Sequence, residues 1–313
     1  MKLIVQIPCY NEAATLPATV GDLPRSISGI DKIEVLVIDD GSTDGTPEVA
    51  RSLGVDHVLS LGSNRGLARA FARGIEHAVA LGADIVVNTD GDNQYRGEDI
   101  AELVKPILAN RADMVIGCRP IVDHPEFGVI KKGLQLVGSW ALRQISTTTV
   151  RDAASGFRAF SREGCQRLFI HSRFSYCMET LIQAGTIGLR VGSVDVGVNA
   201  TLRPSRLFKS IPDYVYKSGM TILAMFVLYR PGRFFASLAG VFLAVAFGLG
   251  VRFLYTWPHD PGRTYLPSLI VLAVCALTGF LLLLLGIVGE LIRAQRRLTE
   301  ENLYLLRKQQ GRR

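Results

Sequence analysis

The chain has 313 residues, 48% of them hydrophobic, which is enough for one large folded domain or for a domain with an appendage. Its formal net charge of +7 favours polyanionic partners such as nucleotides or anionic lipid headgroups. Composition and motifs argue against nucleic acid, because no RNA-binding or zinc-finger signature is present and the basic residues gather near an apolar C-terminal region.

Short β-branched runs recur in the first half of the chain, each bounded by turn or polar residues. They predict strands at residues 3–7, 35–38, 57–61, 85–88 and 114–117. Between them, apolar residues recur at the three- and four-residue spacing of a helix. These stretches predict helices at 46–53, 66–80 and 98–109. The alternation predicts an α/β fold with a mostly parallel, Rossmann-like sheet, in which ligands bind beyond the carboxyl ends of the strands.

The first polar cluster follows the strand at 3–7, and its short apolar run ends at a proline, as expected for a first strand rather than a signal peptide. Pro8, Tyr10, Asn11 and Glu12 offer a ring for stacking on a nucleotide base and an acid for hydrogen bonding. The alternative for Asn11 and Glu12 is the start of a helix.

The second cluster follows the strand at 35–38. Asp39 and Asp40 can accept hydrogen bonds from a base or a ribose, and Gly41 permits a tight turn there. The alternative is a capping turn, because residues 42–44 are suited to cap the following helix. The two roles are compatible, so both acids are candidate nucleotide-binding residues.

The third cluster follows the strand at 85–88 and contains Asp90, Asp92 and Gln94. Alternate side chains of an extended segment share one face, so three oxygen-bearing groups can converge on one hard cation. Magnesium or manganese fits such ligands, and zinc does not. A cation here would bridge the phosphates of a nucleotide diphosphate and make it a leaving group. A solvated acidic turn is the alternative.

Two long apolar runs lie near the C-terminus, at residues 234–255 and 266–289. At about 1.5 Å per residue, each is longer than the roughly 30 Å hydrocarbon core of a membrane. They predict a transmembrane helical hairpin, with buried core helices as the alternative. Just upstream, residues 207–229 mix apolar and basic side chains like an interfacial amphipathic helix, or a helix docked on the first domain.

The chain therefore divides into four predicted segments. These are a catalytic domain at 1–205, interfacial helices at 206–232, two transmembrane helices at 233–290 and a charged C-terminal helix at 291–313. The basic residues outside the hairpin are Arg230, Arg233, Arg293, Arg296 and Arg297, against Arg252 and Arg263 near its loop. This bias predicts an integral membrane protein with both termini in the cytoplasm, in the plasma membrane if the chain is bacterial.

Several features allow a homo-oligomer. Glycines that would let helices pack closely occur at Gly240, Gly248, Gly279 and Gly286, with lipid-facing glycine as the equal alternative. The tail at 290–308 carries leucines that would suit packing against another subunit.

The three clusters together resemble the family 2 glycosyltransferases of the GT-A fold. The segments that carry the resemblance are IPCYNE at 7–12, VIDDGSTDGT at 37–46 and NTDGDNQ at 88–94. Within the family, the chain is closer to the dolichol-phosphate mannose synthase-like branch, which uses polyprenyl phosphate acceptors. The segments at 152–160 and 203–210 support that branch, and the resemblance covers about residues 1–230.

The resemblance implies roles for individual residues. Pro8, Tyr10, Glu12 and Asp39 would hold the nucleotide, and Asp90, Asp92 and Gln94 would hold Mg²⁺ or Mn²⁺. Arg119, after the strand at 114–117, would contact the phosphates, so Asp90, Asp92 and Arg119 form the expected catalytic set. Gly91 stands where alanine is usual in that branch, at a position whose side chain does no chemistry.

A lipid phosphate acceptor has a second pKa near 6, so it is largely a dianion at neutral pH and needs no strong general base. The protein must instead hold two anionic groups together and in line. Candidate acceptor-phosphate residues are Arg119, Lys131, Lys132, Ser155, Arg203 and Arg206. Each basic residue taken alone is also compatible with a solvated surface charge. Glu179 is either a contact to the acceptor or sugar, or a helix-start carboxylate.

The sequence leaves the donor open between GDP-mannose and a UDP-glucose-like sugar nucleotide. Direct displacement would invert the anomeric configuration, a hypothesis drawn from the family. Two alternative functions remain: a tethered transferase for a soluble, protein or glycan acceptor, and a non-catalytic protein that binds the lipid carrier.

Overall fold

The computed structural model describes residues 1–120, 150–170, 176–200, 219–220, 223–259 and 264–310. The chain forms two compact units. The first comprises Met1–Gly219 together with Glu300–Arg313, and the second comprises Met220–Thr299. Each unit is described by itself.

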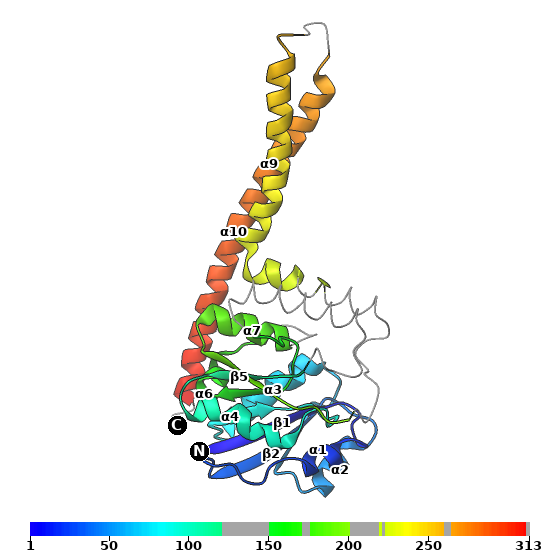
Figure 1. Cartoon of the computed structure of the whole chain (residues 1–313), viewed down its shortest axis with the longest axis vertical. Coiled ribbons are helices and arrows are strands. Elements are labelled where there is room, and N and C mark those ends of the chain that lie inside the picture. Colours follow the sequence, from blue (N-terminus) through cyan, green and yellow to red (C-terminus); the bar gives the residue numbers. More distant parts are fainter. Residues whose placement is uncertain (121–149, 171–175, 201–218, 221–222, 260–263, 311–313) are drawn as a thin grey trace. The chain divides into compact units, whose positions relative to one another are not determined.

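The first unit contains a seven-stranded sheet in the order β3-β2-β1-β4-β6-β5-β7 (Figure 1). Its strands are β1 (Lys2–Cys9), β2 (Lys32–Asp39), β3 (His57–Ser60), β4 (Ile85–Asn88), β5 (Met114–Cys118), β6 (Arg158–Ser161) and β7 (Val191–Asp195). Strand β6 runs antiparallel to its neighbours β4 and β5, and the other pairs are parallel. The predicted mostly parallel sheet and its first five strands are confirmed, whereas β6 and β7 were not predicted.

Helices connect these strands. They are α1 (Leu16–Gly21), α2 (Thr46–Ser52), α3 (Leu67–Ala80), α4 (Ile100–Leu108), α6 (Arg162–Arg167) and α7 (Tyr176–Ile187), with a 3₁₀ turn at Gly97–Asp99. The three predicted helices correspond to α2, α3 and the 3₁₀ turn with α4.

Strand β1 is buried from Leu3 to Cys9 because helices cover both faces of the sheet. Leu3 and Val5 belong to one core cluster with Leu103 of α4. Side chains alternate between the two faces of a strand, so Gln6 points to the opposite face from Leu3 and Val5. On that face it meets α3, where a Cβ on Gly74 would lie 2.4 Å from the Gln6 Oε1 atom. Glycine at 74 therefore lets α3 approach the sheet closely.

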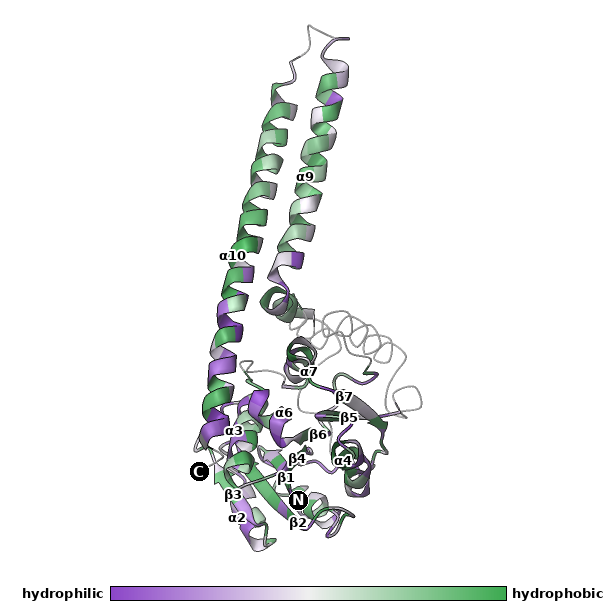
Figure 2. Ribbon diagram, turned by 90° about the vertical axis from the view of Figure 1, so that its left-hand side faces the viewer, coloured by the Kyte–Doolittle hydropathy of each residue, from purple (hydrophilic) through white to green (hydrophobic). Residues whose placement is uncertain are grey.

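The second unit contains α9 (Pro231–Thr256) and the first part of α10 (Leu266–Gln310). By length and composition both helices could cross a membrane, and Figure 2 shows hydrophobic residues along most of α9 and along the first part of α10. Large apolar side chains such as Phe247 (75% exposed) and Leu254 (69%) are not covered by protein, unlike those of a core helix. The predicted charged helix from 291 onward continues α10 without a break.

Two of the four glycines considered for close helix packing serve that purpose within this hairpin. A Cβ on Gly279 would lie 2.7 Å from Leu243 Cγ, and one on Gly286 would lie 3.3 Å from Phe235 Cβ. Gly240 and Gly248 have no atom within 4 Å of the corresponding position. At the start of α9, the Gly232 amide donates to Glu290 Oε1 of α10 at 3.2 Å.

The C-terminal end of α10 belongs to the first unit. Tyr304 is 5% exposed there and lies under the guanidinium of Arg167, 4.5 Å from the ring centroid. Arg307 forms an ion pair with Glu76 of α3 at 2.9 Å. The tail, which the sequence left open for packing on another subunit, thus contacts its own chain.

Candidate active site

The ends of β1, β2 and β4 bring the three predicted polar clusters to one edge of the sheet. In the parallel register, Cys9 pairs with Asp39 and Gln6 pairs with Asn88. The Asp40 amide donates to the Cys9 carbonyl at 2.9 Å, so the segments that follow β1 and β2 begin next to each other. The clusters that follow these strands therefore lie together, as the fold class predicts.

The segment after β1 is tied to the turn after β2. Asn11 adopts a left-handed conformation with φ of 56°, and its side-chain oxygen accepts a hydrogen bond from the Thr43 amide at 2.8 Å. The Glu12 amide donates to the Thr46 hydroxyl at 2.9 Å. Tyr10 is 43% exposed, so its ring is accessible at this edge for stacking on a base.

Asp39 and Asp40 are both buried but have different contacts. Asp39 accepts hydrogen bonds from the Ser42 amide and the Ser60 hydroxyl, each at 2.9 Å. Asp40 uses its two oxygens for the backbone amides of Arg65 and Gly66, each at 2.8 Å, immediately before α3. Asp40 thus stabilises the turn into α3, and nucleotide binding by either acid stays a prediction.

The predicted tight turn after β2 is confirmed at Gly41. Its φ is +74°, and a Cβ there would lie 2.6 Å from the Ser63 carbonyl carbon. The backbone of residues 63 and 64 passes too close for any side chain, so glycine is required for both reasons.

Asp90, Asp92 and Gln94 lie in one turn directly after β4, and all three are partly exposed. The backbone amide of Gln94 donates to Asp92 Oδ1 at 3.2 Å. Gly91 between the two acids is buried against β1, and its carbonyl accepts from the Thr15 and Thr19 hydroxyls at 2.8 and 3.1 Å. The turn is therefore fixed to the segment that carries Glu12.

This donor set fits Mg²⁺ or Mn²⁺. Among the described residues no group of three or more His, Cys, Asp and Glu side chains could hold a metal, so there is no all-protein cage of these ligands. Mg²⁺ is ordinarily bound by one or two carboxylates and completes its shell with substrate phosphates and water. Asp90 and Asp92, with the Gln94 amide oxygen, are of that kind.

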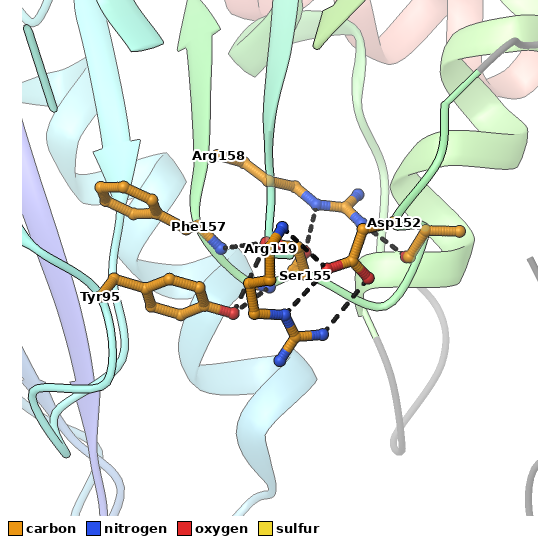
Figure 3. Close-up of polar contacts among 8 residues, drawn as sticks. Tyr95, Arg119, Asp152, Ser155, Phe157 and Arg158 are labelled. Carbon is orange, nitrogen blue, oxygen red and sulfur yellow. Dashed lines mark hydrogen bonds and ion pairs between the residues drawn. The ribbon is translucent and has the colours of Figure 1, made fainter. Parts of the chain in front are cut away.

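Arg119 follows β5 and forms a bidentate ion pair with Asp152 (Figure 3). Its Nε atom lies 2.8 Å from Asp152 Oδ2, and its Nη2 atom lies 3.2 Å from Asp152 Oδ1. The Asp152 side chain is fully buried and that of Arg119 is 11% exposed. The Arg119 guanidinium also lies 6.0 Å from the centroid of the Tyr95 ring. The planar fork of Arg119 is thus held in one orientation.

Electrostatics keeps this arginine charged. Burial acts against the charged form, but the carboxylates of Asp152 and Asp90 outweigh it and raise the pKa of Arg119. The geometry connects Arg119 to Asp90 through Tyr95, because the Gly156 backbone that packs against Asp90 also donates to the Tyr95 hydroxyl at 3.2 Å. Burial also raises the pKa of Tyr95, so its phenol stays neutral.

The loop from Asp152 to Phe157 covers this part of the site. A Cβ on Gly156 would lie 3.1 Å from both carboxylate oxygens of Asp90, so the loop backbone packs against that acid. Asn88 holds it there by donating to the Gly156 carbonyl at 2.9 Å. Ser155, a predicted acceptor-phosphate residue, is fully buried, and its hydroxyl lies 3.5 Å from the Tyr95 hydroxyl.

Two site residues were missed in the sequence. Asp152 begins the segment 152–160 and Tyr95 directly follows the segment 88–94, both of which support the family resemblance, but nothing local distinguishes the two residues from surface polar residues. Lys131, Lys132, Arg203 and Arg206 lie outside the described residues. Glu179 of α7 is fully buried, with Gln183 Nε2 3.5 Å from its Oε1 atom.

Residues 4–169 match the profile described as glycosyl transferase family 2. Among curated proteins, the chain is 29% identical over 212 residues to UDP-N-acetylglucosamine--dolichyl-phosphate N-acetylglucosaminyltransferase of Methanococcus voltae. That match covers 61% of this chain and 82% of the relative. The chain is also 27% identical over 209 residues to undecaprenyl-phosphate mannosyltransferase of Micrococcus luteus, covering 63% of this chain and 83% of that one.

Among solved structures, the fold is similar to glucosyl-3-phosphoglycerate synthase of Mycobacterium tuberculosis in complex with Mn²⁺, UDP and glucosyl-3-phosphoglycerate. The TM-score is 0.56 at 22% sequence identity, over 72% of this chain and 78% of that chain. At this identity the likeness establishes a shared fold.

Proposed function

The chain belongs to glycosyl transferase family 2, and we propose that it transfers a sugar from a nucleotide-diphosphate sugar to polyprenyl phosphate at the cytoplasmic face of a membrane. The observation that carries the proposal is the position of Arg119. Its buried guanidinium is fixed by Asp152 and lies over the ring of Tyr95, whose hydroxyl bonds the Gly156 backbone that packs against Asp90, a candidate metal ligand. A permanent cation in this position is suited to bring a metal-bound diphosphate and a second phosphate together.

The donor half of the site would be formed by the ends of β1 and β2. Tyr10 offers an exposed ring, and Asp39 is a buried acid held by Ser42 and Ser60. Asp90, Asp92 and Gln94 would hold Mg²⁺ or Mn²⁺, which when bound would neutralise the charge that develops on the departing nucleoside diphosphate. Both named relatives support a sugar donor, but they use different sugars, so the proposal leaves the donor open between GDP- and UDP-sugars.

The acceptor half would use Arg119 and the loop at 152–157. One phosphate oxygen of the lipid attacks the anomeric carbon of the sugar as the bond from that carbon to the diphosphate oxygen breaks. The product is a polyprenyl-phosphate sugar with inverted configuration, and the nucleoside diphosphate leaves. No proton must be removed from a dianionic phosphate, so the protein need only orient it.

The apolar helices favour a lipid acceptor over a soluble one. Both α9 and α10 could cross a membrane, and the two relatives are named for dolichyl and undecaprenyl phosphate acceptors. The arginines around the start of α9 and in the later part of α10 outnumber those near the connecting loop. By the positive-inside rule we place both termini in the cytoplasm.

The test is a donor panel with the full-length protein in detergent or nanodiscs. GDP-mannose, UDP-glucose and UDP-N-acetylglucosamine are each supplied with a short polyprenyl phosphate, with Mg²⁺, with Mn²⁺ or with a chelator. We expect one donor to yield a lipid-phosphate sugar and nucleoside diphosphate in equal amounts, and the chelator to abolish both. The unphosphorylated polyprenol is the matched control and should accept no sugar.

Two results would contradict the proposal. Transfer to a soluble acceptor without lipid phosphate would show a tethered transferase of another specificity. No nucleoside diphosphate release with any donor would support a non-catalytic protein that binds the lipid carrier.

A further inference from the structure

Arg158, the first residue of β6, is fully buried and has no part in the mechanism described above. Its guanidinium donates four hydrogen bonds, and Figure 3 shows the one to Ser155. Nε donates to the Ser155 carbonyl at 2.8 Å, and Nη2 donates to the Ala153 carbonyl at 2.8 Å. Nη1 donates to the Cys177 carbonyl and the Thr180 hydroxyl of α7, each at 2.7 Å.

The structure records no ion pair between Arg158 and any described acidic side chain. A buried charge without a counter-charge costs several kcal/mol unless its hydrogen bonds are satisfied. Here neutral carbonyls and one hydroxyl satisfy them. Lysine could not replace this set, because an ammonium has three donors on a flexible stem whereas arginine has five in a rigid plane.

The two carbonyls on the loop side, those of Ala153 and Ser155, lie between the two loop residues that contact the site. Asp152 precedes Ala153 and forms the ion pair with Arg119. Gly156 follows Ser155, packs against the Asp90 carboxylate and donates to the Tyr95 hydroxyl at 3.2 Å. On the other side, Cys177 and Thr180 anchor the guanidinium to a helix. Arg158 therefore connects a rigid element to the loop that orients Arg119 and borders Asp90.

We propose that Arg158 is a positioning residue for glycosyl transfer, which fixes the loop at 152–156 so that Asp152 holds the Arg119 guanidinium in the orientation that binds phosphate. This inference rests on the proposed function and deepens it, because it assigns a part of the transfer step to a residue that touches neither substrate. A misplacement of about 1 Å at a reacting group can lower turnover by about 100-fold.

The test is a double-mutant cycle on turnover with Arg158→Lys, Arg119→Lys and the double variant. If Arg158 acts through Arg119, Arg158→Lys alone lowers kcat by about 10- to 100-fold with little change in KM for the sugar nucleotide. In the Arg119→Lys background it adds less than about threefold, because the orientation it protects is already lost. A residue that merely stabilises the fold would lower activity by the same factor in both backgrounds.

Two further variants keep the test decisive. Thr180→Val leaves Arg158 in place and nearly keeps the side-chain shape. It removes the hydroxyl that accepts from Arg158 Nη1 and that donates to the Tyr176 and Cys177 carbonyls within α7, so we expect it to disturb the fold less than Arg158→Lys does. It should lower kcat by about three- to tenfold, again with a smaller effect beside Arg119→Lys. Arg167→Lys is the matched control, since Arg167 packs on Tyr304 away from the loop and its loss should lower melting temperature without changing kcat.

The outcomes separate this inference from the proposed function. If wild-type protein transfers sugar only to another acceptor, the proposed function fails, and the same cycle run with that acceptor still decides the role of Arg158. If wild-type protein uses polyprenyl phosphate but the two losses multiply, or if Arg158→Lys and Thr180→Val turn over at the wild-type rate, the positioning role is overturned.

Discussion

The two edges of the sheet treat acidic side chains differently. At the amino-terminal edge, Glu34 of β2 is 4% exposed and lies among three basic groups. Lys2 and Lys32 are each 2.7 Å from its carboxylate, and His57 is 2.8 Å away. At the carboxyl edge of the same sheet, the described residues give neither Asp39 nor Asp92 an ion-pair partner, and the hydrogen bonds recorded for them come from neutral groups.

This difference implies that acids at one edge contribute to stability and acids at the other to binding. At the amino-terminal edge the carboxylate of Glu34 is paired with basic groups of the protein itself, so these ion pairs contribute to the free energy of folding. At the carboxyl edge the negative charge of Asp92 is left for an external cation, which is what a metal-dependent diphosphate site requires. Substitutions at the two edges should therefore affect different measurements, and the following four predictions test that separation in order of expected effect.

The largest effect is expected for Asp92→Ala. Loss of one metal carboxylate should lower turnover by about 1000-fold or more while melting temperature stays near that of the wild type. Product formation from the preferred donor and a thermal melt check both. Asp31→Ala, which removes an exposed acid from the opposite edge, is the matched control and should leave turnover unchanged. Near-normal rates for Asp92→Ala would remove the metal role of this turn.

Glu34→Gln should show the reverse pattern. Burial opposes ionisation of Glu34, but its bonds to Lys2, Lys32 and His57 lower its pKa to about 2. A depressed pKa in the folded state gives stability that is present above the unfolded pKa of about 4.5 and is lost as pH falls towards 2. At neutral pH the variant should lose about 2 to 3 kcal/mol of unfolding free energy with unchanged kcat.

The pH dependence is the check on that assignment. Melting temperatures of wild type and Glu34→Gln should differ most at neutral pH and converge as pH is lowered from about 4.5 towards 2. A difference that is constant over this range would show that the acid contributes through packing and not through its charge.

Asp39→Asn should have a smaller effect, on binding. If Asp39 accepts hydrogen bonds from the nucleotide, the variant should raise KM for the sugar nucleotide by about tenfold. The neighbouring variant Asp40→Asn tests specificity, because it disrupts the bonds to the Arg65 and Gly66 amides and should lower melting temperature instead. Equal increases in KM for both variants would support the sequence-based assignment of Asp40 to the nucleotide.

The smallest effect is expected for Gly91→Ala. An added Cβ would lie 3.1 Å from Cys9 Sγ and 3.3 Å from Glu12 Cγ, so its neighbours must shift by a few tenths of an ångström. Turnover should fall by no more than about threefold, since overpacking of this size costs about 1 kcal/mol or less. Adding Cys9→Ala should restore the rate, and no rescue would place the cause elsewhere.

The order of strands and acids along the chain was predictable because it depends only on local sequence patterns. The buried strands β1 to β5 are short apolar runs, and the acids that follow β2 and β4 stand at their carboxyl ends, so the rule for parallel sheets places them together. The hairpin was predictable for the same reason, since length and apolar composition are local properties.

The pairing around Arg119 was not predictable in this way. Asp152 lies 33 residues after Arg119, and Gly156 lies 68 residues after the Asn88 side chain that holds it. Strand β6, inserted antiparallel between β4 and β5, brings these residues to the site, and its four residues begin with an arginine that sequence patterns would place at the surface.

By itself, then, the sequence determined the α/β class, the apolar hairpin and the family, because each follows from spacing along the chain. Only the tertiary structure decided which acid orients Arg119 and which buried cation holds the loop, because those contacts depend on strand order across the sheet. Hydrogen bonds between residues far apart in sequence leave no periodic signal, so they become visible only when the strands are paired.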